Sequence, residues 1–259
     1  VQLAVSLFTL LKNAWHGPVH VMTGDDQARE IVSRFTNSVS PLGGSLTVQD
    51  VRYDSAKVRC YSAKTWSQDW SPFAKTIYCD CDTVFLRDVE EVWPRKDELV
   101  LTQFCSWSCG TPKSKIMNGR VGKWLREAPA MVRIALETPR PAVNTGIVGF
   151  TKDTAFFKPW RELCAKAPKR FIGDETAAQV LIANIGGWRV VGSAYNTSAK
   201  LEKITEVTRV VHGHGAKFFT YPPAREFWLR HFKEAAAADF GGIRSWAGEL
   251  VPELKLYLI

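Results

Sequence analysis

The sequence predicts an α/β protein in which a mixed, mostly parallel central sheet is flanked by helices. Three observations predict this class: helical and strand-like segments alternate along the first third of the chain, the strand-like segments are short, and no apolar run is long enough to cross a membrane. A chain of 259 residues with 46% hydrophobic and 23% charged residues can bury a large core. We therefore expect one domain over residues 1–220, followed by a C-terminal helical extension over residues 221–259.

The first segment, VQLAVSLFTLLKNAW, is apolar enough for a strand but has the periodicity of a helix. Its apolar side chains recur at steps of three and four positions, at Val1, Val5, Phe8, Leu11 and Trp15. Gly17 and Pro18 then form a stop signal. Because a chain of this class normally begins with a strand, we expect a further strand before residue 1 in the native domain.

The remaining elements are justified in order by the same kinds of signal. Helices are predicted where apolar residues recur every three or four positions, in residues 25–35, 62–70, 153–167, 174–185 and 223–240. Strands are predicted where short apolar or alternating runs occur, in residues 18–24, 45–53, 75–80, 98–104, 141–150, 187–195 and 208–215. Residues 105–140 form a long, mostly helical excursion between two of these strands.

The charge balance favours small anionic partners. Thirty-four basic residues against 26 acidic ones leave a formal charge of +8, but no run of five or six Lys or Arg occurs, so we expect no nucleic-acid partner. Six cysteines are too scattered for a disulfide framework in a chain of this length, which indicates reduced thiols and a cytoplasmic protein. The alternative is a lumenal catalytic domain trimmed of its anchor. The glycosylation sequon at Asn196 would matter only in a secretory lumen.

Two aspartates one residue apart end an apolar strand segment in the stretch KTIYCDCDTVFLRDV. Asp80 and Asp82 project alike while the chain stays extended, and they follow the carboxyl end of the strand, where α/β sheets bind their ligands. Two adjacent carboxylates repel each other unless a cation lies between them. Oxygen ligands favour Mg²⁺ or Mn²⁺, so we expect such an ion here. In the alternative interpretation, the two acids only cap Thr83 or a following turn.

A second cluster, VVHGHGAK, lies at the end of another predicted strand. Either His212 or His214 can complete the metal shell. The backbones of Gly213 and Gly215 can approach phosphate closely, and Lys217 can neutralise it.

Two classes of enzyme use paired acids of this kind. In phosphatases of the haloacid-dehalogenase type, Asp80 would be the nucleophile and Asp82 the acid/base. In metal-dependent sugar-nucleotide transferases, both acids hold the cation on the donor diphosphate. A third interpretation is a catalytically silent protein that only binds sugar nucleotides. The phosphatase has no use for the His-Gly cluster, which favours the transferase.

Four motifs follow one another along the chain: SAKTWSQDWSPFAKTIYCDCDTVFLRDVEEVW, NTGIVGF, GDETAAQVLIANIGGWRVV and VVHGHGAK. In this order they resemble the glycogenin-like glycosyltransferases of family 8, and the resemblance extends over roughly residues 1–217. It implies a GT-A (Rossmann-like) fold and a hexosyltransferase that uses a nucleotide-diphosphate sugar, a UDP-sugar, as donor. It also points to retention at the anomeric carbon and to an unspecified carbohydrate, glycan or protein acceptor.

The resemblance also implies roles for individual residues. Three residues would bind Mn²⁺ or Mg²⁺: Asp80, Asp82 and His212. The donor would be held by Lys64, Asp80, Asn144, Thr145, Asp174, Gly213, Gly215 and Lys217, and the catalytic positions would be Asp174, Glu175 and Asn144. Glu175 stands where the family usually has Gln, and Lys217 follows His212 by five positions instead of six. The second departure keeps His214 as a rival ligand.

The acceptor is expected to contact the excursion over residues 105–140, because loops on a rigid scaffold usually carry specificity. Trp107 and Trp124 can stack on a sugar there, although packing is the alternative role for both. The helix over residues 223–240 is expected to be an amphipathic packing helix, and a dimer face or a membrane-surface element is the alternative.

Overall fold

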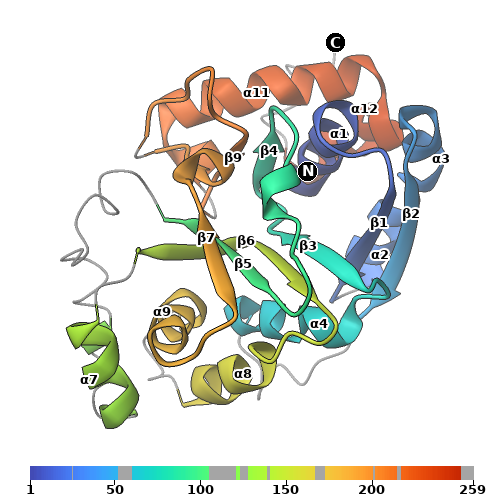
Figure 1. Ribbon diagram of the computed structural model, residues 1–259. Coiled ribbons are helices and arrows are strands. Elements are labelled where there is room, and N and C mark those ends of the chain that lie inside the picture. Colours follow the sequence, from blue (N-terminus) through green and yellow to red (C-terminus); the bar gives the residue numbers. More distant parts are fainter. Residues whose placement is uncertain are drawn as a thin grey trace. The chain divides into compact units, whose positions relative to one another are not determined.

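The computed structural model describes residues 1–24, 26–51, 60–104, 121–122, 128–138, 141–166, 173–200, 202–214 and 217–251. The chain forms two compact units, each built from segments that are far apart in the sequence (Figure 1). The first unit comprises Val1–Arg52, Asp80–Asp88 and Thr197–Ile259, and the second comprises Tyr53–Cys79 and Val89–Asn196.

The first unit combines two small sheets with helices from both ends of the chain. Its helices are α1 (Gln2–Asn13), α2 (Asp26–Ser33), α3 (Thr36–Val39), α10 (Lys217–Thr220), α11 (Pro222–Ala237) and α12 (Ile243–Leu250), with 3-10 turns η1 (Ser40–Leu42) and η5 (Phe240–Gly242). Its strands are β1 (Pro18–Thr23), β2 (Ser45–Asp50), β4 (Thr83–Phe85), β8 (Thr197–Ser198) and β9 (Val210–His212). Strands β1 and β2 pair in parallel, whereas β9 lies between antiparallel β4 and parallel β8.

Helices α1 and α11 pack against each other in the core of the first unit (Figure 1). The predicted N-terminal helix is confirmed, although it ends at Asn13, before Gly17. Helix α11 buries Trp228 and Phe232 and leaves Arg230 exposed, as the amphipathic pattern predicts.

The second unit is a four-stranded sheet covered by helices. Its strands are β3 (Lys75–Cys79), β5 (Leu99–Gln103), β6 (Val143–Thr151) and β7 (Trp188–Val191), in the order β3-β6-β5-β7. Its helices are α4 (Ser67–Trp70), α7 (Pro129–Glu137), α8 (Phe157–Ala165) and α9 (Asp174–Asn184), with 3-10 turns η2 (Cys60–Trp66), η3 (Glu90–Val92) and η4 (Ser193–Tyr195). Helix α9 packs on β6, and both α7 and α8 pack on α9 (Figure 1).

The mixed α/β class is confirmed, but parallel pairings do not predominate. Among the described strands, β6 runs antiparallel to both β3 and β5, and β4 runs antiparallel to β9; the other three pairings are parallel. The sequence hides the direction of β6 because every residue of this strand is buried, so its side chains show no alternation. The long excursion before β6 also allows the chain to return in either direction.

Two smaller expectations concern the helix over residues 62–70 and the cysteines. The predicted helix over residues 62–70 is a 3-10 turn, η2, followed by one turn of α-helix, α4. Within the part of the chain that is described, no helix has both the length and the apolar character that crossing a bilayer requires. Cys79, Cys81 and Cys164 are free thiols, as expected.

Candidate active site

The turn between β3 and β4 carries both candidate metal-binding acids. Asp80 follows β3 directly, and Asp82 directly precedes β4. The hydroxyl of Thr83 donates a 2.9 Å hydrogen bond to the backbone carbonyl of Asp80. Because this hydroxyl has only one proton, it accepts a hydrogen bond from the hydroxyl of Ser6, 2.8 Å away on α1. The turn is therefore tied to α1 through Thr83, whose hydroxyl binds a backbone carbonyl and not a carboxylate.

Strand β9 brings the imidazole of His212 to this turn. His212 is the last residue of β9 and lies opposite Thr83 in the antiparallel β4–β9 pair. The N–H of Gly213 extends the ladder by donating a 2.8 Å hydrogen bond to the carbonyl oxygen of Asp82. Strand pairing thus joins residues that lie 130 positions apart in the sequence.

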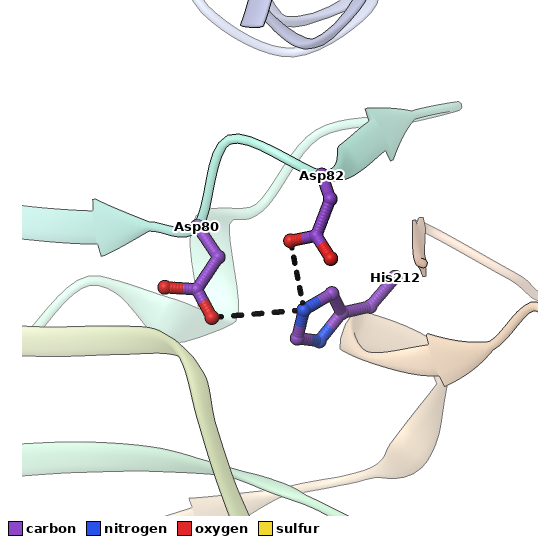
Figure 2. Close-up of side chains that lie close together, drawn as sticks. All are labelled: Asp80, Asp82 and His212. Atoms are coloured by element: carbon purple, nitrogen blue, oxygen red, sulfur yellow. Dashed lines mark hydrogen bonds and ion pairs between the residues drawn. The ribbon is translucent and has the colours of Figure 1, made fainter. Parts of the chain in front are cut away.

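The three side chains point toward one another, as Figure 2 shows. The His212 Nε2 atom lies 3.1 Å from Asp82 Oδ1 and 3.6 Å from Asp80 Oδ2, and the three ligand atoms all lie within 4.8 Å of one another. His212 is 3% exposed and Asp82 is 7% exposed, whereas Asp80 is half-buried. Two carboxylate oxygens and one imidazole nitrogen, converging in a mostly buried place, suit a divalent cation such as Mn²⁺ or Mg²⁺.

Cys81 lies between the two acids but does not belong to this group. Its side chain is exposed at the surface. Partial desolvation, followed by the charges of Asp82 and Asp80, raises the pKa of the Cys81 thiol to about 11. Without a bound cation the thiol is therefore protonated at neutral pH. The group of converging ligand atoms consists of Asp80, Asp82 and His212.

Gly213 and His214 complete the end of β9. A Cβ atom at position 213 would lie 2.5 Å from the ring of Phe218, so only glycine fits there without a shift of its neighbours. His214 has a positive φ of 49°, and its ring centroid lies 4.1 Å from that of His212, with the two planes tilted by 32°. His214 thus lies against the face of His212, and it is His212 that joins the two acids.

A second cluster of predicted site residues lies in the second unit, at the start of α9. Asp174 is the first residue of α9 and is 4% exposed. Its Oδ2 atom accepts a 2.7 Å hydrogen bond from the hydroxyl of Thr145 and lies 3.3 Å from Lys64 Nζ. The indole of Trp160 donates a 2.8 Å hydrogen bond to the backbone carbonyl of Asp174. The other carboxylate oxygen, Oδ1, is buried and has no hydrogen-bond partner.

Asn144 and Glu175 adjoin this cluster. The Asn144 side chain is 2% exposed, and its Nδ2 atom donates to Oε1 of Glu175. Its Oδ1 atom accepts a 2.7 Å hydrogen bond from the backbone N–H of Gly146 and another, also of 2.7 Å, from Nδ2 of Asn196. The structure therefore brings Lys64, Asn144, Thr145, Asp174 and Glu175 together within the second unit.

Some predicted site residues cannot be compared with the structure. Gly215, Trp107 and Trp124 lie outside the described residues, and Lys217 begins α10 with a side chain that is not described.

Sequence reasoning missed three residues, each of which supports one of the two clusters. Ser6 and Thr83 support the metal-binding turn, and Asn196 supports Asn144. Asn196 looks only like a glycosylation sequon in the sequence, yet its side chain is 0% exposed and its amide is engaged inside the protein. The signal for Ser6 and Thr83 is present but weak, because each is a small polar residue inside an otherwise apolar run.

The chain has the fold of a class of glycosyltransferases. The glycosyltransferase GlyE of Streptococcus pneumoniae TIGR4 is 13% identical to it, with a TM-score of 0.60 over 89% of this chain and 57% of GlyE. The apo-form of GlyE gives a TM-score of 0.61. The bifunctional glycosyltransferase WbbM, in its apo structure, is 13% identical, with a TM-score of 0.57 over 90% of this chain and 49% of WbbM.

The chain therefore spans about half the length of GlyE and of WbbM. No family model matches the sequence. No curated protein matches it either. At this level of identity, the likeness establishes the fold.

Proposed function

We propose that this protein is a metal-dependent glycosyltransferase, similar to family 8, that moves a hexose from a UDP-sugar to an acceptor with retention at the anomeric carbon. The observation that carries the proposal is the convergence of Asp80, Asp82 and His212 in a fold shared with glycosyltransferases. The compartment we propose is the cytoplasm, in keeping with the free thiols.

The metal-binding group suits the leaving half of the donor. Asp80 and Asp82 supply two oxygen ligands and His212 supplies a nitrogen ligand, and an imidazole in the set favours Mn²⁺ over Mg²⁺. When bound, the cation would neutralise the two acids and stabilise the negative charge on the departing diphosphate. The leaving diphosphate then needs no general acid. Lys217 and the backbone at Gly213 and Gly215 are the proposed further contacts to phosphate.

The second cluster suits the sugar half of the donor. Asp174 keeps one carboxylate oxygen without a partner in a buried place, where a sugar hydroxyl can donate a hydrogen bond to it. Thr145 and Lys64 hold the other oxygen, which fixes the direction of the carboxylate. The negative charges of Asp174 and Glu175 would support the positive charge that develops at the anomeric carbon.

A thermal-shift experiment tests the proposal. The purified protein is melted with UDP, GDP, UDP-glucose and UDP-galactose, each with and without Mn²⁺. A ligand that binds only the folded state at 100 times its Kd adds about 2.7 kcal/mol of stability, so we expect a uridine nucleotide to raise the melting temperature only when Mn²⁺ is present. Asp82→Asn and His212→Gln should abolish this rise, whereas Asp153→Asn, a change at an exposed acid, should keep it.

Catalysis is measured separately as UDP release from the donor in the presence of Mn²⁺. Release that depends on Asp82 and His212 supports the transferase. Hydrolysis of p-nitrophenyl phosphate that is lost in Asp80→Asn, with no response to UDP-sugars, would instead identify a phosphatase with Asp80 as its nucleophile. Metal-dependent binding without release of UDP would identify a silent sugar-nucleotide-binding protein.

A further inference from the structure

We infer that Asn196 is a positioning residue of the sugar-transfer site, because its amide, together with the backbone N–H of Gly146, holds the Asn144 amide in the orientation that donates to the Glu175 carboxylate. The inference rests on the proposed function for the role of Glu175. It names a residue and a role that the family resemblance does not supply.

The orientation of the Asn144 amide follows from one unambiguous donor. The backbone N–H of Gly146 can only donate, and it lies 2.7 Å from one terminal atom of the Asn144 side chain, so that atom is the oxygen. The amide nitrogen of Asn144 is then the atom that contacts Glu175. Glu175 must accept at this contact, which its carboxylate does in the ionised form.

The orientation of the Asn196 amide follows from that of Asn144. The Asn144 oxygen also lies 2.7 Å from a terminal atom of Asn196, which must therefore be the Asn196 nitrogen. The same nitrogen lies 2.8 Å from the hydroxyl oxygen of Thr102 and donates to it. Asn196 is 0% exposed and Thr102 is 0% exposed, so water does not compete with these hydrogen bonds.

The Asn144 side chain keeps one N–H donor that its described neighbours do not use. The Asn144 oxygen has two acceptor sites, and Gly146 and Asn196 occupy both. Its nitrogen has two protons, one of which goes to Glu175. The second N–H has no acceptor among the described residues and is available to an oxygen of the donor sugar. Asn196 and the Gly146 N–H thus determine which atom of the Asn144 amide faces Glu175 and which N–H remains for a ligand.

The fixed Asn144 amide matters more in this chain because residue 175 is Glu and not Gln. Gln, which the family usually has there, can turn its own amide and so accept or donate as its neighbour requires. A carboxylate at Glu175 can only accept while it is ionised, so a reversed Asn144 amide would set oxygen against oxygen. A fixed amide at Asn144 is therefore needed here more than it would be with Gln.

Asn196→Asp tests the inference because it replaces the donor by an acceptor of the same shape. The new carboxylate sets oxygen against the Asn144 oxygen. Reversing the Asn144 amide relieves that contact but places its nitrogen against the Gly146 N–H and its oxygen against Glu175. Leaving buried polar groups unpaired in this way should lower kcat for donor turnover by about 10- to 100-fold. KM should change less, because the charge that Glu175 supports develops in the transition state. The melting temperature should fall by about 3–8 °C.

The double variant Asn196→Asp/Glu175→Gln gives a readout that does not need catalysis. Gln at position 175 can donate to a reversed Asn144 oxygen, so the double variant should recover part of the melting temperature lost in Asn196→Asp, and Glu175→Gln alone should change it little. If the change in melting temperature of the double variant equals the sum of the changes in the two single variants, the inference is overturned, whether or not the protein transfers sugar. If the wild-type protein turns over no nucleotide sugar, the proposed function fails while this coupling can still be measured.

Two further variants guard against a simple folding defect. Asn184 is a matched control: its amide donates to the backbone carbonyls of Met131 and Val180 at the other end of α9. Asn184→Asp should lower the melting temperature without changing kcat or KM. Should Asn196→Asp not fold by itself, Asn196→Ala removes the donor without adding charge. Wild-type kcat and KM in Asn196→Ala would overturn the inference, and a kcat lowered beyond that of Asn184→Asp would support it.

Discussion

Gly213 and Asp82 are joined by a 2.8 Å hydrogen bond from the Gly213 N–H to the Asp82 carbonyl oxygen. This bond continues the β4–β9 ladder past the pair of Thr83 and His212. A Cβ atom on residue 213 would lie 3.2 Å from that same carbonyl oxygen and 2.5 Å from the Phe218 ring. Close approach of the two backbones is therefore what sets the distance between the imidazole of His212 and the two acids.

Gly213→Ala should weaken the metal site more than it weakens the fold. The new methyl group must push Phe218 or the Asp82 turn away, and such overpacking costs about 1–3 kcal/mol. Since the turn carries two of the three ligands, we expect the Kd for Mn²⁺, measured by titration calorimetry, to rise at least about tenfold. Gly192→Ala is the control, because no atom lies within 4 Å of a Cβ placed at that position. Equal Mn²⁺ affinity in both variants would contradict the close-approach argument.

Ser6→Ala should have a smaller effect on the same site. It removes a buried hydroxyl that donates to Thr83, but Thr83 keeps its own hydrogen bond to the Asp80 carbonyl. The loss of one such bond costs about 1 kcal/mol, which corresponds to a few-fold change in Mn²⁺ affinity if the turn loosens. Thr83→Val removes both bonds and should cost more. Thr83→Val with unchanged Mn²⁺ affinity would show that the turn holds its shape without these hydroxyls.

The position of the metal-binding group is largely predictable from sequence, whereas its support is not. The apolar run before Asp80 and the pair of acids that follows it predict a metal site at the end of this strand. The resemblance to family 8 adds His212, with His214 as a rival ligand. The hydroxyls of Ser6 and Thr83 carry no comparable pattern, because single hydrogen bonds between distant residues leave no periodicity in the sequence.

Strand direction and buried amides are the other features that the sequence did not reveal. Strand β6 is buried along its whole length, and neither its composition nor its spacing distinguishes a parallel from an antiparallel neighbour. Asn196 has the composition of a surface sequon, and only the tertiary structure shows that its amide meets Asn144. Contacts between residues far apart in the sequence decide both the direction of β6 and the partner of the Asn196 amide, and the sequence does not show those contacts.

Lys64→Met should destabilise the second unit strongly. Lys64 and Asp174 form an ion pair at 3.3 Å with side chains that are 10% and 4% exposed, and removing one partner leaves a buried charge. Such a change costs about 3–5 kcal/mol, and Lys64→Met/Asp174→Asn should recover much of it. Lys12 and Glu234 form a surface ion pair with side chains that are 45% and 38% exposed. Lys12→Met should therefore lower the free energy of unfolding in urea by less than about 1 kcal/mol. Equal costs for Lys64→Met and Lys12→Met would rule out a buried ion pair.

His231 should make the protein less stable as the pH falls. It lies on α11 with 7% exposure, its ring meets Phe227 edge-on at 4.8 Å, and neither ring nitrogen has a hydrogen-bond partner. Burial lowers the pKa of His231 below its ordinary value of 6.5; Glu234 opposes this shift, and Arg230 and Lys12 assist it. Between the lowered pKa and 6.5 the unfolded chain binds a proton that the folded protein does not, so stability is full above pH 6.5 and is lost as the pH falls below it.

His231→Leu should remove this dependence. The free energy of unfolding in urea, measured from pH 7.5 to pH 5, should fall less steeply in the variant than in the wild type, because no buried imidazole remains to be protonated on unfolding. The variant should also be the more stable of the two at the acid end, since Leu buries no unpaired ring nitrogen. Phe227→Leu changes the packing around position 231 without removing a titratable group, and it should keep the wild-type slope. Parallel pH profiles for His231→Leu and the wild type would show that His231 titrates alike in the folded and unfolded chains.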